Sequence, residues 1–277
     1  MQPKEPQIHS SRAIWLLAQF ELIRQFKSKR GIISLLAFAI VWFFIIKVIV
    51  LQSVSVLNEQ GSQGVASNIL NYFNLNALLQ WPSTELAVFW LFAMLIFPFV
   101  TIVMTSDQTA SDVKRGTVRF LLLRTTRTQL LLGRFTGKLC FLTMLIITTI
   151  LPVVLISIVK ESSNLLPLLS LSLFVCSSLI IVCIPLMALM ALLNSIYQSS
   201  KISMLFALIL VPLISSVIKY AVNYFPPIES LLYLLPGIQI FDTLQLASYN
   251  FQIIVTPLLQ TTAFLVLAKM QLARKSL

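Results

Sequence analysis

The sequence LAVFWLFAMLIFPFVTIVMTS, which covers Leu86–Ser106, contains no charged residue. A helix needs about 20 consecutive apolar residues to cross the roughly 30 Å hydrocarbon core of a bilayer, and this stretch is long enough. In lipid, a helix is the open structure that satisfies the backbone hydrogen-bonding groups of such a segment. We therefore interpret Leu86–Ser106 as a membrane-spanning helix in which Pro98 produces a kink and not a break.

Five further apolar stretches of this kind lie on either side of it, at about 31–51, 138–159, 165–194, 202–218 and 251–268. The chain has 277 residues, of which 58% are hydrophobic and 10% charged. A soluble domain has about a quarter of its residues charged. The sequence thus predicts an all-α polytopic membrane protein, with about six spans in one transmembrane domain over residues 1–277.

Lys and Arg are distributed unevenly between the segments that join these spans. Of the 20 basic residues, six precede the first span and seven lie in the stretch from Ser106 through Lys138. The opposite side receives Lys160 and Lys219. Because cytoplasmic segments are enriched in Lys and Arg, both termini and the segment after the second span are predicted to be cytoplasmic. The net charge of +11 then reflects orientation and not nucleic-acid binding.

Motifs for catalysis, nucleotide binding or metal binding are missing from the sequence. The single histidine is His9, and the three cysteines lie in predicted spans without metal-ligand spacing. The stretch GRFTGKL (Gly133–Leu139) lacks the glycine spacing and the Ser or Thr of a Walker A motif. The chain is therefore not expected to be an enzyme or to hold a cofactor or metal.

Ionisable residues are also rare deep inside the predicted spans, where Lys47 lies near the end of the first one. A secondary transporter needs such residues for ion or proton coupling, and a membrane enzyme usually needs a histidine or paired carboxylates at depth. Both classes are therefore less favoured alternatives. A transporter of this composition must take its energy from another protein.

The stretch RAIWLLAQFELIRQFK (Arg12–Lys27) precedes the first span and has helical periodicity. Its apolar residues recur every three or four positions, and polar residues fill the other faces. We predict an interfacial helix on the cytoplasmic membrane surface, and a cytosolic helix that packs on a partner is the alternative. Its candidate interface residues are Trp15, Phe20, Glu21, Arg24 and Phe26.

The segment that follows the second span begins SDQTASDVKRGT (Ser106–Thr117). Ser106 or Asp107 can cap the start of a helix, and Gly116 is suited to its end. These features predict a short charged cytoplasmic helix, with an ordinary solvated loop as the alternative. Beyond it, arginines alternate with apolar runs, which favours a path at headgroup level before the chain re-enters the bilayer. Gly133 and Gly137 could serve close helix packing or a turn.

The run DVKRGTVRFLLLRTTRTQLLLGRFTGK (Asp112–Lys138) resembles the first cytoplasmic loop of type-2 ABC transporter permeases. The matching positions are Gly116, Thr117, Leu121, Leu122, Arg127 and Gly133. Thr125 and Thr126 replace a proline that is usual in the turn, and Arg134 stands where lysine is usual. ELIRQFKSKRG (Glu21–Gly31) is similar to the elbow helix of that family, and LLYLLPGIQIFDTL (Leu231–Leu244) to its external segment before the last span.

The resemblance implies a permease subunit of an ATP-driven ABC transporter. Members of this family pair two permease chains, as a homodimer or heterodimer, with two nucleotide-binding ATPase subunits, which would bind the ATP and magnesium. Their charged helix after the second span acts as a coupling helix that contacts the ATPase. Here the resemblance assigns that contact to Asp107, Gln108, Ser111, Asp112, Lys114, Arg115, Gly116 and Thr117.

Export across a bacterial inner membrane is the expected activity. The alternative is a non-transporting scaffold or sensor subunit of an ATPase complex. The proline-broken segment from Asn223 to Asn250 is expected to form short external helices or a re-entrant hairpin, because it is too irregular to span. From the family resemblance, we expect it to gate the exit to the outside.

Overall fold

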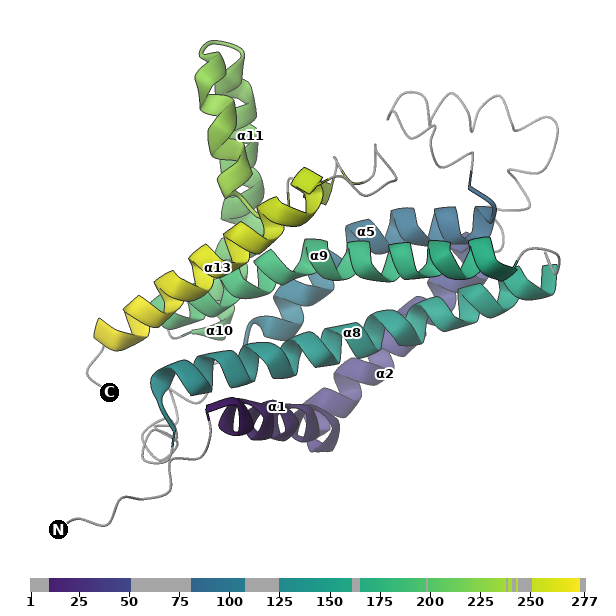
Figure 1. The fold of residues 1–277 in the computed structure, drawn as a ribbon, viewed down its shortest axis with the longest axis horizontal. Coiled ribbons are helices and arrows are strands. Elements are labelled where there is room, and N and C mark those ends of the chain that lie inside the picture. Colours follow the sequence, from purple (N-terminus) through teal and green to yellow (C-terminus); the bar gives the residue numbers. More distant parts are fainter. Residues whose placement is uncertain are drawn as a thin grey trace.

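The computed structural model describes residues 10–50, 81–107, 125–160, 165–197, 199–237, 239–240, 243 and 251–274. Over these residues the regular secondary structure is helical and contains no strand (Figure 1). Within the same residues, six helical segments are long and apolar enough to cross a membrane. The predicted all-α polytopic membrane fold is confirmed.

The chain begins with α1 (Ser10–Lys27), and Ser28 caps the next helix by accepting a hydrogen bond from the Gly31 backbone N–H. The remaining elements follow in order: α2 (Lys29–Phe44) with η1 (Ile45–Val50), α5 (Thr84–Thr105), α8 (Arg127–Lys160), α9 (Leu165–Tyr197), α10 (Ser200–Leu205) with η3 (Phe206–Leu210) and α11 (Val211–Val222), η4 (Pro226–Leu234), and α13 (Phe251–Arg274).

The helix α9 is the central element, because α5, α8 and α13 all pack against it (Figure 1). The core is rich in aromatic side chains of α5, including Phe89, Trp90 and Phe97, which are fully buried. The indole N–H of Trp90 donates to the hydroxyl of Ser178 on α9 at 3.0 Å. This bond satisfies a buried polar group that would otherwise oppose the packing.

Helices α5, α8, α9 and α13 each contain an internal proline and continue through it. These are Pro98, Pro152, Pro185 and Pro257. A proline removes one helical hydrogen bond, but within a membrane the rest of the backbone still has no better structure than a helix.

The third long helix differs from the sequence prediction. The predicted span began at Lys138, after a stretch at headgroup level, whereas α8 begins at Arg127 and is helical through that stretch. Arg134, which was expected at headgroup level, and Lys138, which was expected to begin the span, are buried at 5% exposure each. Their burial is possible because α1 covers this part of α8, which hydropathy alone cannot reveal.

Before the last span, the chain forms the 3-10 helix η4, which is connected to α13 by a glutamine side chain. Gln260 Nε2 donates to the backbone carbonyls of Tyr233, at 2.6 Å, and of Leu235, at 3.2 Å. Carbonyl groups at a helix end lack donors within the helix, so the amide of Gln260 satisfies them. Non-helical backbone is thus held against a membrane-spanning helix.

Candidate functional site

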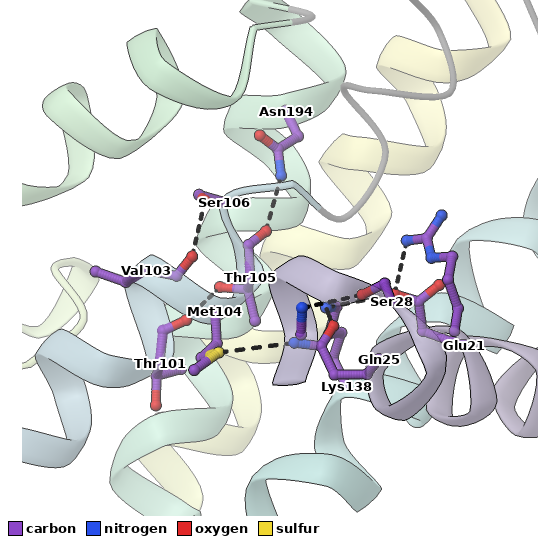
Figure 2. A network of polar contacts seen from close by, with 12 residues as sticks. Glu21, Gln25, Ser28, Thr101, Val103, Met104, Thr105, Ser106, Lys138 and Asn194 are labelled. Atoms are coloured by element: carbon purple, nitrogen blue, oxygen red, sulfur yellow. Dashed lines mark hydrogen bonds and ion pairs between the residues drawn. The ribbon is translucent and has the colours of Figure 1, made fainter. Parts of the chain in front are cut away.

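Three helices meet where α5 ends, and they include both helices that border residues 108–124. These helices are α1, the last turn of α5 and the first third of α8 (Figure 2). We call this region the α1 end of the bundle and define it by Glu21, Gln25, Met104, Thr105 and Lys138. Figure 2 shows polar side chains from α1, α5, α8 and α9 gathered there.

Two glycines of α8 allow α1 to approach this helix closely. A Cβ atom at Gly133 would lie 2.6 Å from Leu17 Cβ, and one at Gly137 would lie 2.9 Å from Glu21 Cβ. Separations below 3 Å between these atoms require movement of the neighbour. The two glycines therefore serve helix packing and not a turn.

The close contact buries charged side chains of both helices. Lys138 Nζ lies 3.3 Å from Glu21 Oε1, and the two side chains are 5% and 3% exposed. Arg24 Nη2 donates to the same carboxylate oxygen at 2.8 Å. A buried charge is tolerated when it is paired and hydrogen-bonded, so the carboxylate of Glu21 allows Lys138 to lie inside the bundle.

Gln25 connects α8 to α5 through the two ends of its side-chain amide. Lys138 Nζ donates to Gln25 Oε1 at 3.1 Å, and Gln25 Nε2 donates to the sulfur of Met104 at 4.0 Å (Figure 2). The second contact is weak, because a thioether is a poor acceptor. Through Gln25, α1 nevertheless joins the two helices that flank residues 108–124.

The last turn of α5 is also held by α9 and α10. Asn194 Nδ2 of α9 donates to the carbonyl of Thr105 at 3.1 Å, and Ser200 Oγ donates to Ser106 Oγ at 3.2 Å. The last carbonyls of a helix need donors from outside the helix, and the fully buried Asn194 provides one. The chain therefore leaves α5 from a turn that three other helices contact.

The start of α8 is fixed in turn to the end of α13. Arg127 Nη1 donates to the carbonyl of Leu272 and, at 3.1 Å, to that of Ala273. A cation at a helix C-terminus satisfies the final carbonyls and interacts favourably with the helix dipole. Both borders of residues 108–124 are thus anchored in the bundle by side-chain hydrogen bonds.

A family model described as ABC-2 family transporter protein matches residues 15–276, which is nearly the whole chain. The chain belongs to the ABC-2 transporter family. No curated protein matches this sequence. Family membership and the six apolar helices identify an integral membrane protein that is a permease subunit of an ABC transporter. ABC-2 permeases in general associate with ATPase subunits and with a partner permease.

In this ABC-2 permease, the residues predicted to contact the ATPase lie mostly outside the described residues. Asp107 is described, is exposed, and directly follows the last turn of α5. The other seven predicted contact residues are Gln108, Ser111, Asp112, Lys114, Arg115, Gly116 and Thr117. Their helical conformation and their role remain predictions.

The predicted interfacial residues of this permease separate into two groups on α1. Trp15, Phe20 and Phe26 are exposed at 54%, 61% and 38%, whereas Glu21 is buried and Arg24 half-buried. The interfacial position of this helix stays a prediction, and the buried ion pair of Glu21 was not predicted from the sequence. The sequence signal for it was weak: Glu21 and Gln25 lie one helical turn apart, on the same face of α1.

The residues that sequence reasoning missed at this site are Gln25, Lys138 and Asn194. Asn194 interrupts an apolar run near the end of α9, which is a signal that a polar residue has a specific partner. Across the part of the chain that the structure describes, no cluster of three or more His, Cys, Asp or Glu side chains could hold a metal ion.

Proposed function

We propose that this ABC-2 permease is a subunit of an exporter, forms the translocation path as a dimer, and is driven by ATPase subunits bound through the 107–117 coupling helix. The observation that carries the proposal is the bridge made by Gln25 between Lys138 of α8 and Met104 of α5. Residues 108–124 join α5 and α8 along the chain, and the side chain of Gln25 also connects these two helices. Movement imposed on this segment would therefore be passed on to both helices.

The proposed orientation places both termini and the α1 end in the cytoplasm of a bacterial inner membrane. It is supported by the excess of Lys and Arg before α2 and between α5 and α8. The exposed apolar side chains Trp15 and Phe20 on α1 would then enter the membrane interface. ATP and magnesium would bind to the partner ATPase, where the energy of transport would originate.

The proposed cargo is a lipid, an amphipathic peptide or a hydrophobic natural product. Among the described residues, Glu85 pairs with Lys160 at the far end of the bundle, and Glu21 pairs with Lys138 and Arg24 at the α1 end. A path for small ions would need charged or ion-coordinating groups along the middle of the spans. Apolar spans of this kind favour a cargo that carries its own apolar surface.

Substitution in the proposed coupling helix tests the function. The permease is reconstituted with the ATPase encoded beside its gene, and Asp112→Ala, Arg115→Ala and Gly116→Leu variants are compared with Lys29→Ala. Lys29 is an exposed basic residue outside the segment and serves as the control. We expect the coupling variants to lower the ATPase rate of the complex about tenfold, as loss of a conformational step does. Unchanged ATPase rates would show that residues 107–117 do not couple the subunits.

Cysteine labelling and flux assays test the remaining parts. In a cysteine-free background, Ser67→Cys should react with an impermeant maleimide added outside the cell, and Ser111→Cys should react only after permeabilisation. The reverse pattern would overturn the orientation. Vesicles that hold the intact complex should move a fluorescent phospholipid when ATP is supplied. A complex that hydrolyses ATP but moves neither lipid nor amphipathic peptide would favour the scaffold function.

A further inference from the structure

The helices α5 and α8 are also joined at the opposite end of the bundle, where α5 begins and α8 ends. Lys160 Nζ donates to Glu85 Oε1 at 2.9 Å, and the hydroxyl oxygens of Ser83 and Ser157 lie 2.9 Å apart. We call these four residues the far-end lock. They come from positions just before α5, in its first turn and in the last turn of α8.

The contacts of the far-end lock are stronger than those that hold the other end of α5. Glu85 accepts hydrogen bonds on both oxygens, because Ser83 Oγ donates to Oε2 at 3.1 Å. The Glu85 side chain is 6% exposed and that of Lys160 is 47% exposed. A hydrogen bond to a charged acceptor is stronger than a neutral one, and solvent at Lys160 reduces this advantage. At the α1 end, α5 is held by neutral bonds through Met104, Thr105 and Ser106. A force along α5 should therefore separate the α1 end first.

Burial along α5 shows the same asymmetry. No residue from 84 to 94 is exposed, although Thr84, Val88, Leu91 and Phe92 are half-buried, so the half next to the far-end lock is the more enclosed one. In the other half, Leu95, Phe99 and Val103 are exposed at 54%, 54% and 39%. These three residues are four positions apart and form one stripe along the helix. One side of that half of α5 is therefore exposed.

Pro98 lies where the two halves of α5 meet. Proline has no backbone N–H, so the carbonyl four residues earlier, at Met94, loses its helical hydrogen bond. Just beyond it, Thr101 Oγ1 donates to the carbonyl of Phe97 at 2.7 Å, and Thr105 Oγ1 donates to that of Thr101 at 2.6 Å. Bonds of this type bend helices. A part of α5 that lacks one helical hydrogen bond thus lies between its more enclosed half and the half with the exposed stripe.

We propose that α5 is a hinged lever, in which Glu85 and Lys160 hold the enclosed half against α8 while the half beyond Pro98 swings with the coupling helix. Glu85 and Lys160 are then positioning residues for transport. The proposal rests on the proposed function, because that function supplies the movement of residues 107–117. To that function the proposal adds two features of α5: its end at the far-end lock stays fixed, and the contact between Ser106 and Ser200 changes during transport.

Two serine pairs with nearly equal separations provide a matched test. Ser83 and Ser157 are 2.9 Å apart at the fixed end, and Ser106 and Ser200 are 3.2 Å apart at the moving end. S83C/S157C and S106C/S200C variants are made after replacing Cys140, Cys176 and Cys183 with alanine. Each permease is assembled with its ATPase subunits in nanodiscs, and thiol titration verifies disulfide formation after oxidation.

We expect the oxidised S83C/S157C complex to keep the ATPase rate of its reduced form. The oxidised S106C/S200C complex should lose about tenfold in rate and recover on reduction, because its disulfide blocks a required conformational step. A reversible loss of ATPase rate in oxidised S83C/S157C, or failure of this variant to form a disulfide, would contradict the proposal that this end of α5 stays fixed against α8. A full ATPase rate in oxidised S106C/S200C would contradict the proposal that Ser106 moves relative to Ser200.

A different result identifies failure of the proposed function itself. If the cysteine-free complex has the same ATPase rate as complexes with coupling-helix substitutions, then residues 107–117 do not couple the subunits. The proposed lever then has no source of movement. If those substitutions lower the ATPase rate but neither disulfide does, the coupling role of residues 107–117 is supported and the proposed movement of α5 is wrong.

Discussion

Lys138 Nζ lies 3.3 Å from Oε1 of Glu21, although one residue is part of a membrane-spanning helix and the other of the helix that precedes all the spans. Both side chains are almost completely buried. The pair therefore connects the N-terminal helix to the helix that follows residues 108–124. It explains how a lysine of α8 can be buried inside the bundle.

Removal of either partner of this pair should destabilise the permease. Glu21→Gln leaves the buried Lys138 without its charged partner, at a cost of about 3–5 kcal/mol. Lys138→Met should cost less, because Glu21 keeps its ion pair with Arg24. The double variant should be more stable than the sum of the single effects predicts, because it removes both charges. Thermal unfolding in detergent measures the difference, with Lys27→Met on the exposed face of α1 as the control. Additive effects would show that the two residues do not interact.

Addition of a methyl group at the α1–α8 contact should separate the two helices. Gly133→Ala and Gly137→Ala place a Cβ at 2.6 Å from Leu17 Cβ and 2.9 Å from Glu21 Cβ, and overpacking of this kind costs about 1–3 kcal/mol. Cys140→Val, on the exposed side of the same helix, should have little effect. The unfolding temperature of each variant provides the measurement, and wild-type values for both glycine variants would contradict the close approach.

Asn194 should determine how firmly the last turn of α5 is held. Asn194→Leu removes the donor to the Thr105 carbonyl, and an unpaired buried carbonyl costs about 1–3 kcal/mol. We expect faster amide hydrogen exchange in peptides that cover residues 100–107. The control is Ser170→Ala, which removes an exposed hydroxyl bonded to its own helix. Equal exchange in Asn194→Leu and wild type would exclude this role.

Gln260 should hold the segment before the last span in place. Gln260→Leu leaves the carbonyls of Tyr233 and Leu235 without their side-chain donor. Peptides covering residues 226–237 should then exchange amide hydrogens faster, because local opening becomes easier. Thr262→Val is the control, since Thr262 is exposed and bonds to the carbonyl of Leu259 in its own helix. An unchanged exchange rate in Gln260→Leu would mean that other contacts hold η4.

The number and type of the spans could be predicted from the sequence because each long apolar stretch must become a helix in lipid. Leu86–Ser106 became α5 with its ends moved by one or two residues. The start of α8 was missed because Arg134 and Lys138 look like residues at the headgroup level. Local hydropathy counts a charge as exposed unless a partner is known, and the partner here lies on a distant part of the chain.

The sequence by itself determined that this protein is an all-helical membrane permease, because span number depends on local composition and the family depends on a linear pattern. Only the tertiary structure decided that Glu21 and Gln25 meet Lys138, that Asn194 caps α5, and that Glu85 pairs with Lys160. Such contacts join residues far apart in the chain, and their energies depend on distance, burial and donor geometry. Those quantities exist only after the helices have packed.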